Sequence, residues 1–156
     1  MTPYPWSDLA AIIGLILING LFSMSELAIV SARPARLKVA AEKGSAGAKK
    51  ALEMASDPGK FLSTVQIGIT LVSIIAGAYS GASLGHPTAE RLMAWGVPVR
   101  YADDAGFAAV IALTTYLSVT IGELVPKQVA LRAAEAIAIL AALPMSMVAR
   151  AGAPLV

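Results

Sequence analysis

The stretch FLSTVQIGITLVSIIAGAYSGASLG, residues 61–85, carries no charged side chain over 25 residues. At a rise of 1.5 Å per residue, a helix of this length is about 37 Å long, enough to cross the roughly 30 Å hydrocarbon core of a bilayer. The rest of the chain is also apolar, with 57% hydrophobic residues, 14% charged residues and a mean hydropathy of +0.72. These values predict an all-α membrane protein.

Two further stretches are long and apolar enough to span. Residues 9–32 contain one charge, Glu26, and residues 105–125 contain one, Glu123. Residues 133–149 are also apolar, but their uncharged part is only 14 residues long and contains Pro144. We therefore expect three transmembrane helices and a fourth helix that lies at the interface.

The segment between the first two spans, residues 33–60, has seven basic residues against three acids. A short loop this basic belongs in the cytoplasm. Its pattern predicts a juxtamembrane helical hairpin broken at Gly44 and Ser45, attracted to anionic lipid. It has no aromatic residue to stack on bases, so we expect no nucleic-acid binding.

Residues 86–104 are predicted to form a polar connection on the outer face, because they contain two prolines and only two basic residues. The topology is then N-terminus outside and C-terminus cytoplasmic, in a multi-pass protein of the cell inner (plasma) membrane. The single histidine, His86, falls in this connection, and the chain has no cysteine. Disulfides, thiolate metal sites and multi-histidine metal centres are therefore excluded, and without an HExxH motif or a Ser–His pair at one depth we expect no enzyme.

The stretch IGELVPK, residues 121–127, places an acid and a proline at the inner end of the third span. Pro126 has no N–H to offer the carbonyl of Gly122, so that carbonyl must find a neighbouring helix, water or an ion. Together with the Glu123 carboxylate it describes an oxygen-rich cation site. A simple proline kink, with Glu123 paired to Lys127 four residues later, explains the same residues equally well.

Polar side chains recur on one face of each span. They are Asn19, Ser23 and Glu26 on the first, Gln66, Thr70 and Ser73 on the second, and Thr115 and Ser118 on the third, where Gly122 shares the face and Glu123 lies next to it. Counted inward from the basic boundaries, Glu26, Gln66 and Glu123 lie roughly 6–10 Å deep. A single buried hydroxyl often bonds only to its own helix, but matched carboxylates predict a cation-selective cavity open to the cytoplasm.

A ridge of small residues, formed by Gly77, Gly81 and Gly85, repeats the GxxxG spacing on the second span. Such ridges allow helices to approach closely, either within one chain or between two copies.

Three motifs of the chain are similar to those of one family. The stretches NGLFSMSELA (19–28), QIGIT (66–70) and GELVPK (122–127) resemble, in order and spacing, the transmembrane domain of the CNNM/CorC family of magnesium transporters. The resemblance implies a homodimer with three spans per protomer and a belt of juxtamembrane helices. It also implies Mg²⁺ export, coupled to inward movement of Na⁺.

By position, the resemblance implies ion ligands from the side chains of Ser23, Ser25, Gln66 and Glu123, with main-chain oxygen near Gly122. Ser25 lies off the polar face derived above, so its side chain fits that face less well. Family members usually continue into paired CBS domains that bind ATP, which this chain lacks, so no ATP binding is expected within it.

Two functions fit these observations. In the first, the chain transports Mg²⁺, with Glu123 neutralising the ion. In the second, it is a sensor or scaffold that binds Mg²⁺ or Na⁺ without transporting it and regulates another channel. The role of Glu26 stays open between a second ligand, a helix-pairing residue and a proton carrier.

Overall fold

The structure, a computed structural model, describes residues 3–152 and 154. It is 91% helical, and the described residues form no strand. The elements are α1 (Trp6–Ser31), α2 (Pro34–Glu42), α3 (Ala46–Ser56), α4 (Pro58–Ala94), α5 (Val99–Val119), η1 (Thr120–Leu124), α6 (Val125–Arg132) and α7 (Ala134–Gly152). The all-helical fold expected from the hydropathy pattern is therefore confirmed.

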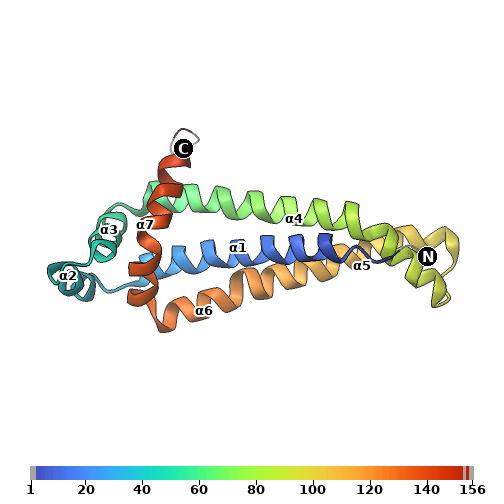
Figure 1. Cartoon of the computed structure of the whole chain (residues 1–156), viewed down its shortest axis with the longest axis horizontal. Coiled ribbons are helices and arrows are strands. Elements are labelled where there is room, and N and C mark those ends of the chain that lie inside the picture. Colours follow the sequence, from blue (N-terminus) through green and yellow to red (C-terminus); the bar gives the residue numbers. More distant parts are fainter. Residues whose placement is uncertain (1–2, 153, 155–156) are drawn as a thin grey trace.

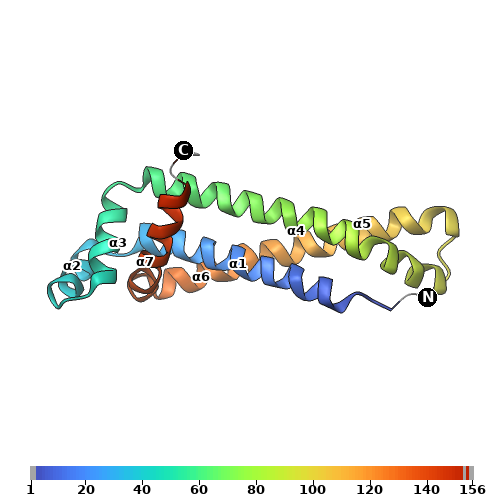
Figure 2. The same ribbon diagram turned by 45° about the horizontal axis from the view of Figure 1, so that its top comes forward.

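Long helices run along the long axis of the molecule (Figure 1). They are α1, α4 and the continuous helix Val99–Arg132, which comprises α5, η1 and α6. The helix α7 runs across this bundle close to one end, and a view turned by 45° shows the same crossing (Figure 2). We call this the hairpin end, because α2 and α3 also lie there, and we call the opposite end, with residues 95–98, the turn end.

Within the described part of the chain, four helices are long and apolar enough to cross a membrane by length and composition: α1, α4, Val99–Arg132 and α7. The helix α7 is longer than its uncharged part of 14 residues, since Pro144 lies inside a helix of 19 residues and does not end it. Its buried residues Ala134, Ala138, Ala142 and Met145 share one face. This face of mostly small side chains packs α7 across α1 and α3 at the hairpin end.

The polar connection predicted over residues 86–104 is wrong in its secondary structure. The helix α4 continues through Pro87 to Ala94, and only residues 95–98 separate it from α5. Its 37 residues give about 56 Å, well beyond the hydrocarbon core. The polar side chains of this part pair between the two helices, since His86 Nδ1 lies 3.2 Å from Asp103 Oδ1.

The helical hairpin predicted within residues 33–60 is confirmed. The helices α2 and α3 are separated by Gly44, whose φ of +96° favours glycine at that turn. Ser45 then caps α3, its side chain accepting a hydrogen bond of 3.1 Å from the Ala48 N–H.

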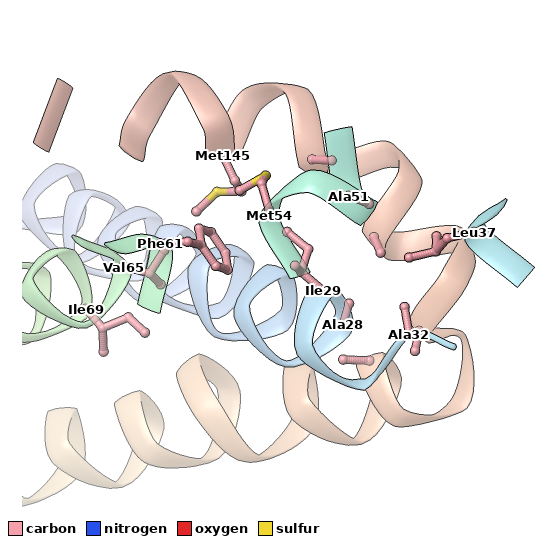
Figure 3. Close-up of a cluster of buried hydrophobic side chains, with 14 residues drawn as sticks. Ala28, Ile29, Ala32, Leu37, Ala51, Met54, Phe61, Val65, Ile69 and Met145 are labelled. Atoms are coloured by element: carbon pink, nitrogen blue, oxygen red, sulfur yellow. The ribbon is translucent and has the colours of Figure 1, made fainter. Parts of the chain in front are cut away.

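The largest apolar core lies at the hairpin end, where side chains from α1, α3, α4 and α7 meet (Figure 3). It includes Ile29, Met54, Phe61 and Met145, all 8% exposed or less. A smaller cluster of Ile12, Ile16, Leu84 and Val110 joins α1, α4 and α5 toward the turn end. Along the chain, residues 19–26 of α1 and residues 114–123 of α5 and η1 lie between the parts of the helices that form these two clusters.

The glycine ridge of α4 packs within the same chain. A Cβ added to Gly81 would lie 2.6 Å from Phe107 Cε2, and one added to Gly85 would touch Phe107 at 3.7 Å. A Cβ added to Gly106 on α5 would lie 2.7 Å from backbone atoms of α4. Gly77 has nothing within 4 Å of such a Cβ, so only this glycine of the ridge is open to another partner.

Candidate functional site

The centre of the candidate site is η1, one turn of π-helix over Thr120–Leu124. The Val125 N–H donates to the Thr120 carbonyl, a five-residue step that replaces the usual four-residue one. Pro126 follows and offers no N–H to Gly122, so the main chain is irregular where the sequence places its acid. Single turns of π-helix of this kind are frequent at functional sites.

The Gly122 carbonyl finds its partner on α1. The buried Asn19 side chain donates from Nδ2 to the Gly122 oxygen over 3.4 Å. Because Pro126 has no N–H to donate, the Gly122 carbonyl was expected to need another partner, and the neighbouring helix α1 provides one. The carbonyl keeps a second lone pair, because one long hydrogen bond does not use both.

Two glycines make this approach of α1 and η1 possible. A Cβ on Gly122 would lie 3.1 Å from Asn19 Nδ2, and one on Gly20 would lie 3.1 Å from Pro126 Cγ and 3.2 Å from the Ile121 carbonyl. All three distances are shorter than ordinary van der Waals contacts, so a side chain at either glycine would require the neighbouring atoms to move. The sequence pattern did not predict a role for Gly20, although its position directly after Asn19 could have indicated close packing.

Two buried oxygen atoms of α1 have no hydrogen-bond partner in the described part of the chain: Asn19 Oδ1 and Ser23 Oγ. Asn19 is 2% exposed and Ser23 is fully buried, and the two residues are one helical turn apart on α1. An unpaired buried polar group costs about 1–3 kcal/mol, so each of these oxygens calls for an explanation. A bound cation is one, since both atoms are potential ligands.

A cavity lies beside Glu123. Glu123 is half-buried and lines this space of about 230 Å³ between α4 and α5. The other lining residues are Ser73, Gly77, Thr114, Thr115, Ser118 and Val119. The predicted residues Ser73, Ser118 and Glu123 therefore meet around one cavity. The buried Thr114 was missed, because the polar-face pattern assigned its neighbour Thr115.

The second acid of the site, Glu26, is half-buried on α1 and interacts electrostatically with both Lys127 and Glu123. Glu123 and Lys127 form no ion pair within 4.0 Å, as far as the described residues show. The two acids and the lysine thus occupy neighbouring positions on α1, η1 and α6.

The remaining predicted residues are more peripheral. The Ser25 hydroxyl donates to the Leu21 carbonyl of its own helix over 2.7 Å. Gln66 and Thr70 are exposed on α4, and neither has a hydrogen bond from its side chain within residues 3–152. Among the described residues, no group of three or more His, Cys, Asp or Glu residues is arranged so that it could hold a metal ion. Any cation here must therefore rely on few carboxylates and on neutral oxygens.

An apolar helical bundle that buries polar oxygens around an irregular helical turn defines a multi-pass membrane protein with an internal polar site. The chain belongs to the CNNM family, since the family's Cyclin M transmembrane N-terminal domain matches residues 10–156. This is a family of membrane transporters.

Individual relatives agree with this assignment. A UPF0053 protein of Synechocystis is 46% identical over 149 residues, which cover 96% of this chain and 33% of the relative. The UPF0053 protein YhdT of Bacillus subtilis is 36% identical, over 85% of this chain and 29% of the relative. The polyamine export protein of Escherichia coli is 29% identical over 96% of this chain and 33% of its own length. The chain thus spans about a third of the length of these relatives.

Proposed function

We propose that this chain transports Mg²⁺ across the cell inner membrane, exporting it in exchange for inward movement of Na⁺. The observation that carries the proposal is the pair of unpaired buried oxygens on α1, Asn19 Oδ1 and Ser23 Oγ, together with the hydrogen bond from the Asn19 amide to the Gly122 carbonyl. Hard oxygen ligands of this kind suit Mg²⁺ or Na⁺ better than softer metals. Glu123, the next residue after Gly122, neutralises part of the ion's charge.

The ion keeps several of its waters in this proposal, because Mg²⁺ dehydrates reluctantly and the site offers few carboxylates. Ser25 still has lone pairs on its oxygen after donating its proton to Leu21, so it can join the ligands. We assign the exposed Gln66 to the mouth of the site, and the cavity beside Glu123 to the water-filled path that reaches it.

The membrane arrangement in this proposal has three spans, α1, α4 and Val99–Arg132, with the N-terminus outside and the C-terminus in the cytoplasm. The crosswise position of α7 supports an interfacial place for that helix (Figure 1). Gln66, Thr70 and Thr115 are exposed on the long helices, where lipid would leave their polar groups unpaired. A second copy of the chain covering them would make the functional unit a homodimer.

The test is Mg²⁺ flux from proteoliposomes that contain a Mg²⁺-sensitive dye. We expect Glu123→Gln to lower the flux at least tenfold, because the variant keeps the shape of the side chain and loses its charge. The matched control is Glu42→Gln, an exposed acid of the hairpin, which should leave the flux unchanged. Equal flux in wild type and Glu123→Gln would refute the assignment.

The sensor or scaffold remains the main alternative, and the same preparation separates it from transport. Purified chain that binds Mg²⁺ with loss of binding in Glu123→Gln, yet shows no flux under opposed Mg²⁺ and Na⁺ gradients, would favour the sensor. Flux that depends on the Na⁺ gradient would favour the exchanger.

A second transported substrate deserves a direct comparison, because a relative covering nearly the whole chain is named a polyamine export protein. A polyamine is an extended organic cation, and the cavity of about 230 Å³ with its hydroxyl groups and one acid is large enough for part of one. Flux of radiolabelled spermidine, measured beside Mg²⁺ flux in the same vesicles, decides between the two cations.

A further inference from the structure

A larger cavity, outside the candidate ion site, lies at the hairpin end. It has a volume of about 620 Å³ and lies between the end of α3, the start of α4 and the end of α7. Its lining residues are Lys50, Glu53, Met54, Ser56, Asp57, Lys60, Phe61, Thr64, Ser146, Ala149 and Arg150. We call it the α3–α4–α7 pocket. None of these residues takes part in the ion site described above.

Basic side chains reach this pocket from three different helices: Lys50 from α3, Lys60 from α4 and Arg150 from α7. The first turn of α4 also borders it, and the side chain of Asp57, the N-cap residue, makes no capping hydrogen bond there. The N-terminus of a long helix favours an anion, and here three cations accompany it.

The acids of the pocket do not neutralise this arrangement. Lys50 lies 3.4 Å from Glu53, whose side chain is 71% exposed. An exposed pair of this kind contributes little and can exchange its partner for a stronger anion. Asp57 is exposed and forms no ion pair within the described residues. Of the three basic side chains that line the pocket in the described part of the chain, only Lys50 is therefore paired with one of the pocket's acids.

The floor of the pocket is apolar. Phe61 and Met54 are 3% and 8% exposed, and they pack on Met145 in the main core (Figure 3). The hydroxyls of Thr64 and Ser146 are bonded back to the carbonyls of Lys60 and Leu143. A ligand with an anionic head and a hydrocarbon tail fits a pocket with this floor and a basic rim.

The pocket also lies at the boundary where such a ligand is found. Lys60 is the last charge before the uncharged stretch 61–85, so the basic rim is level with the headgroups and Phe61 is level with the first acyl carbons. We propose that the α3–α4–α7 pocket binds the phosphate of an anionic glycerophospholipid, with the start of an acyl chain over Phe61 and Met54. The bound lipid ties α7 to the start of α4.

The test uses the purified chain in nanodiscs of phosphatidylcholine with or without phosphatidylglycerol, and counts retained phosphatidylglycerol by native mass spectrometry. The double variant Lys60→Gln, Arg150→Gln should lose retention about tenfold. The matched control, Lys43→Gln with Lys49→Gln, removes the same charge from exposed positions of the hairpin end outside the pocket and should retain the lipid. Equal loss in both double variants, or loss in neither, overturns the proposal.

A variant that is expected to increase lipid retention controls for the possibility that the double variant loses lipid because it does not fold. Asp57→Asn removes a negative charge from the pocket and should increase phosphatidylglycerol retention, with helicity unchanged by circular dichroism. Inorganic phosphate and glycerol phosphate, added at millimolar concentration, distinguish a headgroup from a free phosphate. If either one raises Tm as much as phosphatidylglycerol does, the pocket binds a soluble phosphate compound without an acyl chain, and the lipid proposal fails.

Discussion

At the scale of single residues, the two ends of the Asn19 amide differ where the helix α1 meets the irregular turn η1. Its nitrogen donates to the Gly122 carbonyl, and its oxygen is left buried without a partner among the described atoms. A leucine at this position would fill the same space but could hold neither group. The amide is thus suited to hold a main-chain carbonyl in place and to offer a further oxygen beside it.

The two serines of α1 differ in a way that can be tested. Ser23 Oγ is buried and unpaired, whereas Ser25 Oγ donates to the Leu21 carbonyl. Ser23→Ala should weaken Mg²⁺ binding at least tenfold, yet raise the free energy of unfolding without Mg²⁺ by up to about 1 kcal/mol, because an unsatisfied hydroxyl is removed. Isothermal titration and thermal unfolding measure the two effects.

Ser25→Ala provides the comparison. Because its hydroxyl already bonds within α1, this change should lower Mg²⁺ affinity less than Ser23→Ala does and should not stabilise the chain. Finding the larger loss of affinity in Ser25→Ala would reverse the order of the two ligands proposed above.

At the scale of elements, the pair α4 and α5 depends on close contact between glycines. Glycine at 106 lets the two backbones meet, since an added Cβ would lie 2.7 Å from the Ala89 nitrogen and 2.7 Å from the Gly85 carbonyl. Both of these are backbone atoms, which cannot rotate away as a side chain can. The contact therefore fixes how α4 and α5 cross, and with it the walls of the cavity beside Glu123.

Gly106→Ala should destabilise the chain by about 1–3 kcal/mol, because an extra methyl group has no space between the two backbones. Gly77→Ala is the matched control, as the Cβ at that position meets nothing within 4 Å. Thermal unfolding in one detergent compares the two variants. A Tm for Gly106→Ala at or above that of Gly77→Ala would mean that the helices do not cross as described.

At the scale of the whole molecule, α4 and α5 extend past the hydrocarbon core, which leaves their polar ends at the turn end. The hairpin end, in contrast, gathers the basic residues of the segment 33–60. The asymmetry favours an orientation with the hairpin end in the cytoplasm.

Labelling with a membrane-impermeant maleimide tests this orientation, since the chain has no cysteine of its own. Trp95→Cys, at an exposed position between α4 and α5, should react in intact cells. Lys43→Cys, at the exposed end of α2, should react only after the cells are made permeable. The reverse pattern would place the turn end in the cytoplasm and overturn the proposed topology.

Much of the molecule follows from local properties of the sequence. Uncharged length predicted the long apolar helices, and the glycine at 44 with the serine after it predicted the break between α2 and α3. Pro126 predicted that the Gly122 carbonyl would need a partner outside its own helix. These predictions hold because hydropathy, helix caps and the missing N–H of proline act within a few residues.

What only the tertiary structure decided is which surfaces meet. The sequence left open whether a neighbouring helix, water or an ion would bind the Gly122 carbonyl, and the structure shows a hydrogen bond from Asn19. The sequence also left open whether Gly81 and Gly85 pack within one chain or between two, and the structure shows them against Phe107 of the same chain. The sequence pattern also mistook the extension of α4 past Pro87 for a loop, because that helix is held by its contacts with α5. Contacts between distant segments depend on shape and close approach, which the polar and apolar pattern of one helix does not specify.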